Sequence, residues 1–181
     1  MTLVIWLIIL AGILVLFILM YNKLVNLRNQ SENAWSQIDV QLKRRADLIP
    51  NLIESVKGYI KHEKEHLQMV TELRSKLVNG NVHEKAEANN QFSNALKTIF
   101  AVSENYPKLK ANTNFLNLQE ELSATENKIS YSRQFYNDSV YGLNTAIESF
   151  PSNIMAKLFN FSQKEYFEID EQDRKLVKVK F

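Results

Sequence analysis

The chain contains no cysteine, which excludes disulfides, thiol catalysis and cysteine-ligated zinc. Glycine and proline are scarce, with 4 and 3 among 181 residues, or about 4% against an average near 12%. That scarcity argues against turn-rich β-sandwiches, barrels and flexible linkers. An excess of one charge sign is also lacking, because 22 Lys and Arg against 20 Asp and Glu leave a net charge of +2. The charge therefore indicates no nucleic-acid partner.

The first 20 residues form the most distinctive segment. They include 18 apolar residues and no charge, and the run from Leu3 to Met20 is interrupted only by Gly12. Twenty helical residues cover roughly 30 Å, the thickness of the hydrocarbon layer of a membrane. A signal peptide would carry a basic n-region, and a core helix would have a polar face. We therefore predict a retained transmembrane helix over residues 1–20, with Tyr21 at the interface.

The distribution of basic residues predicts the orientation of this helix. No Lys or Arg precedes the apolar run, whereas Lys23 and Arg28 follow it closely. The positive-inside rule then places the N-terminus outside the cell and the C-terminal body in the cytoplasm.

The rest of the chain has helical spacing throughout and no segment of period 2, so we predict an all-α protein. Four helices are expected at about 21–46, 48–78, 84–105 and 113–149, together forming an antiparallel four-helix bundle over residues 21–151. Pro50 predicts a break near Ala46–Ile49, although the apolar phase continues across it, so a single kinked helix is the alternative. Asn79-Gly80-Asn81 predicts a turn, with Gly80 suited to a positive φ. The steps of four and three from Tyr136 to Phe150 predict a buried, coiled-coil-like stripe.

Residues 152–181 form a C-terminal tail with a short apolar face at Ile154, Met155, Leu158 and Phe159. Two interpretations remain open for it. The tail packs loosely on the bundle, or it is a segment that binds a membrane surface or a partner.

Many short motifs resemble the LemA family, and they are spread over almost the whole chain. They are Tyr21-Asn22, Leu24-Val25, Arg28-Asn29, Ala34-Trp35, Ile38, Gln41–Leu52, Val56–Tyr59, His62-Glu63, Tyr106-Pro107, Leu109–Ala111, Asn114-Phe115, Tyr136-Asn137, Phe150-Pro151 and Tyr166–Glu168. The resemblance implies a bacterial, single-span membrane protein with a cytoplasmic helical bundle and an undefined molecular role. It carries over no catalytic residue. One departure is Leu143-Asn144, where such proteins often have a second Tyr-Asn pair.

His62-Glu63-Lys64-Glu65-His66 matches the H-E-x-x-H pattern, in which two histidines one turn apart bind zinc and the glutamate acts as a base. Glu84 or Glu87 could supply a third ligand. The motif lies in a very hydrophilic stretch, so we interpret it as a solvated helix face. A zinc site at His62 and His66 is the alternative.

Lys43, Arg44 and Arg45 form a basic cluster. We expect either salt bridges within the bundle or a binding site for an acidic partner or lipid headgroup. The amides of Asn51, Asn114, Asn137 and Asn144 lie on or beside apolar stripes and are expected to have structural roles.

The sequence therefore predicts a non-enzymatic, membrane-anchored scaffold or interaction module, with no catalytic residue and no cofactor. Its expected partners are the lipid bilayer and other membrane or cytoplasmic proteins. A membrane-bound zinc metallopeptidase is the alternative function.

Overall fold

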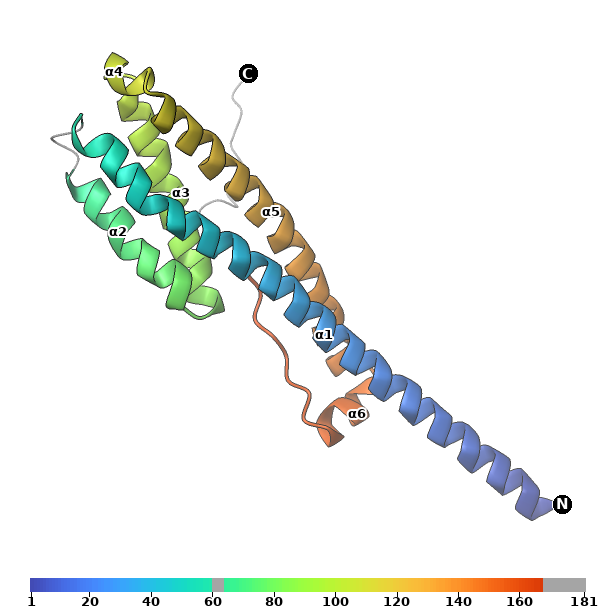
Figure 1. The fold of residues 1–181 in the computed structure, drawn as a ribbon. Helices are drawn as coiled ribbons and strands as arrows, with labels where there is room; N and C mark the ends of the chain where they lie inside the picture. The colour runs from blue at the N-terminus through green and yellow to red at the C-terminus, as the bar shows by residue number, and fades with distance from the viewer. Residues whose placement is uncertain (60–63, 168–181) are drawn as a thin grey trace, which may run out of the picture. The chain divides into compact units, whose positions relative to one another are not determined.

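The computed structural model describes residues 1–59 and 64–167, with the side chains of 64–67 left out. Over this part of the chain the secondary structure is helical and contains no strand, which confirms the all-α prediction. The helices are α1 (Thr2–Lys57), α2 (Lys64–Asn79), α3 (Val82–Ser103), α4 (Pro107–Lys110), α5 (Thr113–Glu148) and α6 (Ser152–Leu158) (Figure 1).

The helix α1 continues through Pro50, so the predicted break near Ala46–Ile49 is wrong and the alternative of one helix holds. Proline removes one backbone hydrogen bond and crowds the carbonyl of Ala46. Against this cost, Ala46, Ile49 and Leu52 are all buried on one continuous stripe, while the Pro50 ring lies on the exposed face. Burial on both sides of the proline therefore keeps the helix intact.

The end of α1 lies instead at Lys57, followed by a turn at Gly58 and Tyr59. The predicted helix 48–78 is thus divided between α1 and α2. Gly58 next to Lys57 is a common signal for a helix C-terminus, and it marks this end better than Pro50 does. The other helix bounds lie within about two residues of those expected, a normal scatter for helix ends.

The chain divides into two compact units. Unit 1 comprises Met1–Ser36 and Gln134–Glu165, and unit 2 comprises Gln37–Arg133 with Tyr166 and Phe167. The helices α1 and α5 are therefore each divided between the two units, with one part of the helix in unit 1 and the other in unit 2.

In unit 2, α2 and α3 pack side by side after a tight turn (Figure 1). The predicted turn at Asn79-Gly80-Asn81 is confirmed, but the φ of Gly80 is not positive. Glycine is needed for space instead, because a Cβ there would lie 2.6 Å from the carbonyl oxygen of Lys76. Asn81 then starts α3 through a capping box with Glu84.

The core of unit 2 is mainly apolar and includes side chains from every helix that contributes to the unit. Its large members are Ile38, Leu42, Ile49, Leu52, Val56, Val70, Leu73, Leu77, Phe92, Leu96, Ile99, Leu109, Phe115, Leu122 and Ile129, all of which are buried.

Unit 1 has a smaller core at the junction of α1, α5 and α6. Leu24, Ala146, Met155 and Ala156 are buried there, and Met20, Leu27, Ile147 and Phe161 pack against them. The predicted stripe of α5 is confirmed as far as Leu143, and Ile147 is half-buried. Phe150 is not part of it. The helix ends at Glu148, so the helical phase no longer applies and the Phe150 ring is exposed.

Candidate functional site

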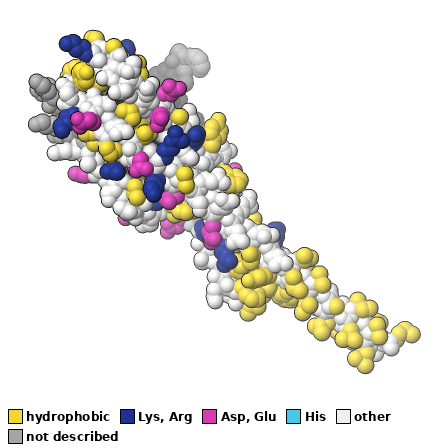
Figure 2. All heavy atoms as spheres, viewed as in Figure 1, with side chains coloured by type: hydrophobic (Ala, Val, Ile, Leu, Met, Phe, Trp, Pro, Cys, Tyr) yellow, Lys and Arg dark blue, Asp and Glu magenta, His cyan; other side chains and the backbone are white. Residues whose placement is uncertain are grey.

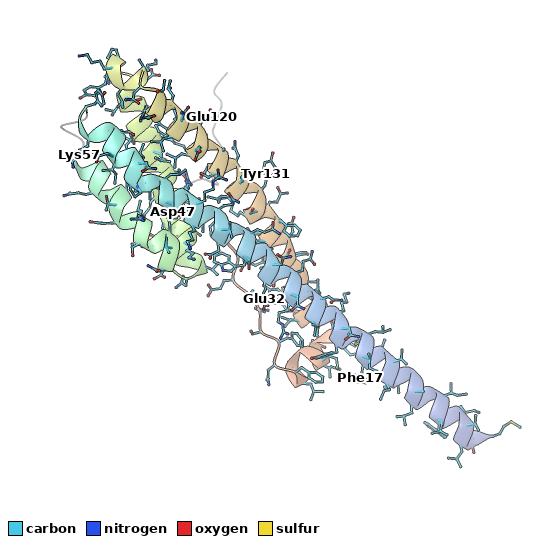
Figure 3. The ribbon with its side chains drawn as sticks, in the orientation of Figure 1. Phe17, Glu32, Asp47, Lys57, Glu120 and Tyr131 are labelled. Carbon is cyan, nitrogen blue, oxygen red and sulfur yellow. The ribbon has the colours of Figure 1, made fainter. Side chains whose placement is uncertain are left out.

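The N-terminal part of α1 exposes an apolar surface on all its sides. From Leu3 to Leu19 every large hydrophobic side chain is at least 40% exposed, and Figure 2 shows hydrophobic side chains along the whole visible face of this part of the helix. Phe17 projects outward near its C-terminal end (Figure 3). Apolar area of this kind costs about 25 cal/mol per Å² in water. An apolar environment that surrounds the helix, such as the interior of a membrane, is the setting in which this sequence is stable.

Three aromatic rings meet where this apolar surface ends. The ring centroid of Tyr21 lies 4.7 Å from that of Phe159 and 6.0 Å from that of Phe161. The guanidinium of Arg28 stands 5.2 Å from the centroid of the Phe161 ring, within range of a cation–π interaction. Aromatic and basic side chains together are typical of the boundary between a membrane and water.

The end of α6 brings these rings to the boundary. Asn160 adopts a φ of 56°, in the left-handed region. The backbone N–H of Phe161 then donates to the carbonyl of Ala156 at 2.9 Å, and that of Asn160 to Lys157 at 3.4 Å. This is a Schellman motif, and asparagine is one of the few residues that tolerate it. The motif reverses the chain so that Phe161 packs back on α1.

The segment after Phe161 is fastened to α5 by side chains that bond its backbone. Asn144 Nδ2 donates to the carbonyl of Lys164, and the N–H of Lys164 donates to Asn144 Oδ1, each at 2.9 Å. The hydroxyl of Tyr136 donates to the carbonyl of Glu165 at 2.8 Å. Asn144 therefore has the structural role predicted for it.

This environment changes the pKa of the Tyr136 hydroxyl. Burial, together with the nearby charge of Glu165, raises the pKa of Tyr136 to about 12. Its ring also lies 5.4 Å, centroid to centroid, from that of Trp35 on α1. At the family departure noted above, Leu143 is buried in the core while the following Asn144 makes the bonds to Lys164.

The predicted basic cluster is divided by the structure. Lys43 and Arg44 are exposed, and their role in binding stays a prediction. Arg45 is buried and forms a salt bridge with Glu126 of α5. Its Nη1 also donates to Asn89 Oδ1 at 2.6 Å and to Ser93 Oγ at 3.1 Å, both on α3.

Further contacts define the setting of Arg45. Its guanidinium stands 4.8 Å from the centroid of the Phe92 ring. Burial lowers the pKa of Arg45, while the charge of Glu126 and a hydrogen bond to it act in the opposite direction. The sequence does hold a signal for this burial, because Arg45 falls on the stripe Ile38, Leu42, Ile49, Leu52 and Val56 at steps of three and four. Its partner Glu126 lies in a distant helix, and no local pattern indicates it.

The H-E-x-x-H motif lies at the edge of what the structure describes. His62 and Glu63 are outside the described residues, and His66 belongs to α2 without a described side chain. Among the described residues, no three His, Asp or Glu side chains are grouped so that they could hold a metal ion. The zinc alternative therefore stays an untested prediction.

These features define a class: an all-α protein whose N-terminal helix is long and apolar enough to cross a membrane, followed by a polar helical body. The chain belongs to the LemA family, whose model matches residues 34–181. It is 30% identical to Protein LemA of Metamycoplasma hominis over 155 residues, which cover 84% of this chain and 71% of the relative.

More distant similarity links the chain to magnetosome proteins. It is 23% identical to Magnetosome protein MamQ 2 of Paramagnetospirillum magneticum over 82% of this chain. It is 22% identical to Magnetosome protein MamQ of Magnetospirillum gryphiswaldense over 81% of this chain. The chain spans 64% of the length of each of these two relatives.

Proposed function

We propose that the protein is a membrane-anchored helical scaffold, held by residues 1–20 and with its C-terminal body in the cytoplasm. The observation that carries the proposal is the exposure of every large hydrophobic side chain from Leu3 to Leu19. Lys23 and Arg28, which lie on α1 just after its apolar run and carry positive charge, support the cytoplasmic location of the body.

The proposal includes an antiparallel four-helix bundle built from the parts of α1, α2, α3 and α5 in unit 2. Asp39 on α1 pairs with Lys85 on α3, and Arg45 with Asn89 and Ser93. Residue numbers rise together along both helices, so α1 and α3 run parallel. The tight turn between α2 and α3 makes these neighbours antiparallel. Parallel first and third helices are what an up-down-up-down bundle requires.

The body acts, in this proposal, by binding other proteins and not by catalysis. One observation supports this. Arg45 and Asn89, which are buried, and Ser93 and Glu126, which are partly exposed, are joined to one another by hydrogen bonds and a salt bridge, so these polar side chains are engaged in contacts within unit 2. The binding partners are other membrane or cytoplasmic proteins.

Topology tests the anchor directly. A reporter that is active only in the cytoplasm should be active when it is fused after Phe181. The full-length chain should stay with membranes during an alkaline carbonate wash. A variant lacking residues 2–21 should be found in the soluble fraction. Release of the full chain by carbonate, or a processed terminus near Tyr21, would show that the apolar helix is a cleaved signal.

Metal analysis tests the non-enzymatic role. Protein purified in detergent should contain no stoichiometric zinc. Bound zinc at one equivalent that is lost in His66→Ala would instead support the metallopeptidase alternative.

A further inference from the structure

The short helix α6 carries an exposed apolar face. Ile154 and Leu158, four residues apart and so on one side of the helix, are 51% and 67% exposed. Phe159 and Phe150, which flank the helix, are 49% and 80% exposed. The opposite side holds Met155 and Ala156, which are buried in the core of unit 1. The helix α6 therefore has two apolar sides. One is packed against unit 1, and the other is exposed.

The open face lies beside the end of the apolar helix. Met155 and Ala156 pack in one cluster with Leu24, and Met20 packs against the same cluster. The Phe159 ring contacts Tyr21, the first residue after the apolar run. Figure 2 shows hydrophobic side chains passing from the N-terminal helix onto the surface at α6. The exposed surface of α6 is thus continuous with the one that a membrane would cover.

Positive charge borders this face. Lys157 is exposed on α6 between Ile154 and Leu158, and Lys23 is exposed on α1 two residues beyond Tyr21. A lysine in such a place can lay its aliphatic stem along apolar surface while its ammonium group reaches a phosphate. The combination of apolar side chains and lysines suits the headgroup region of a bilayer.

We propose that α6, with Phe150 and Phe159, is a second membrane contact that lies in the headgroup layer of the bilayer crossed by α1. This inference rests on the anchoring proposed above. A helix of seven residues would bind a membrane weakly on its own. Here α1 already holds it at the surface, so insertion becomes an intramolecular step with a high effective concentration. The contact fixes the depth and tilt of unit 1 on the membrane.

The absence of cysteine in the chain allows a direct test with single-cysteine variants of the full-length protein. Leu158→Cys probes α6 and Leu10→Cys probes the middle of the apolar helix. Tyr141→Cys is the matched control, because Tyr141 is equally exposed but belongs to α5. Its neighbour Gly142 lies beside Leu27, seven residues beyond Met20, which is about 10 Å along α1.

Each variant is labelled with an environment-sensitive fluorophore and reconstituted in vesicles of phosphatidylcholine and phosphatidylglycerol. The lipids carry a nitroxide either near the headgroup or deep in the acyl chain. The label at 158 should be quenched at least about twofold more strongly by the shallow nitroxide than the label at 141. The label at 10 should be quenched best by the deep nitroxide. Ile154→Cys should behave as Leu158→Cys does, and both sites are exposed enough to accept the change without unfolding.

The outcomes separate the two proposals. No quenching of the label at 10 would overturn the anchor itself. Quenching at 10 together with equal, weak quenching at 158 and 141 would overturn the α6 contact alone. A label at 158 that is protected from both lipid nitroxide and a water-soluble quencher would mean that protein covers this face, and would also overturn the proposal.

Discussion

Replacing Glu126 by Gln removes the charge that neutralises Arg45 while keeping the shape of the side chain. The side chain of Arg45 is 2% exposed, so the guanidinium would remain in the interior with neutral hydrogen-bond partners alone, which are Asn89, Ser93 and the uncharged amide now at position 126. Breaking a fully buried pair costs about 3–5 kcal/mol, because the remaining charge stays unneutralised. An exposed pair contributes about 0–1 kcal/mol. The side chain of Glu126 is 41% exposed, so water already solvates the carboxylate and the pair is fully buried only at Arg45.

The expected loss lies between these limits, at about 2 kcal/mol in the free energy of unfolding. The double variant Arg45→Met with Glu126→Gln should be more stable than Glu126→Gln alone. It no longer buries a charge, and methionine can pack against the Phe92 ring that the guanidinium now covers. Recovery should be incomplete, since the amide of Asn89 loses a hydrogen-bond donor.

Chemical denaturation of the full-length protein in detergent, followed by circular dichroism, measures these differences. Glu120→Gln, an exposed change on the same helix (Figure 3), is the control and should alter stability by less than about 0.5 kcal/mol. If Glu126→Gln is as mild as the control, Arg45 is solvated and the reasoning from its burial is wrong. A double variant weaker than Glu126→Gln would equally refute the argument that the unpaired charge carries the cost.

Three further predictions concern α5 and the His62–His66 stretch. Ile129→Ala, at a fully buried position, should cost about 2–5 kcal/mol, whereas His66→Ala should cost less than about 0.5 kcal/mol; equal losses in thermal melts would mean that the histidine is buried or binds metal. Asn144→Asp keeps an acceptor for the N–H of Lys164 but loses the donor to its carbonyl, so stability should fall by about 1–3 kcal/mol in urea titrations, and an unchanged midpoint would contradict the two bonds. Because the pKa of Tyr136 is raised to about 12 in the folded state, its stabilising effect is complete below pH 10 and is lost as the pH rises towards 12. Ultraviolet titration should include a component with that midpoint, and Tyr136→Phe should remove this component.

The helical class and most helix bounds could be predicted because apolar residues repeat at helical spacing along almost the whole chain. The error at Pro50 has a physical cause. A proline lowers the stability of one turn, but the buried stripe from Ile38 to Val56 extends over about five turns and outweighs it. The helix α1 ends at Lys57 instead, where Gly58 interrupts the pattern.

The contacts of the candidate site residues could be predicted less well from the sequence than the helices could. Arg45 looks like one member of an exposed basic cluster, and its burial depends on Glu126, which only tertiary packing brings near. In the same way, Phe150 continues the numerical spacing of α5 although the helix has already ended at Glu148. Spacing predicts which face of a helix is buried, but not where that face stops having a partner.

The bonds between Asn144 and Lys164 have a consequence for how the sequence can vary. Both end on main-chain atoms, so the amide recognises a peptide group and is indifferent to the side chain attached to it. Among the described residues, the Lys164 side chain forms a salt bridge with Glu32, in an exposed contact that contributes little. Nearly any residue should therefore be accepted at 164 except proline, which has no N–H to offer. If every residue were substituted in turn, position 144 should accept few amino acids, whereas position 164 should accept many.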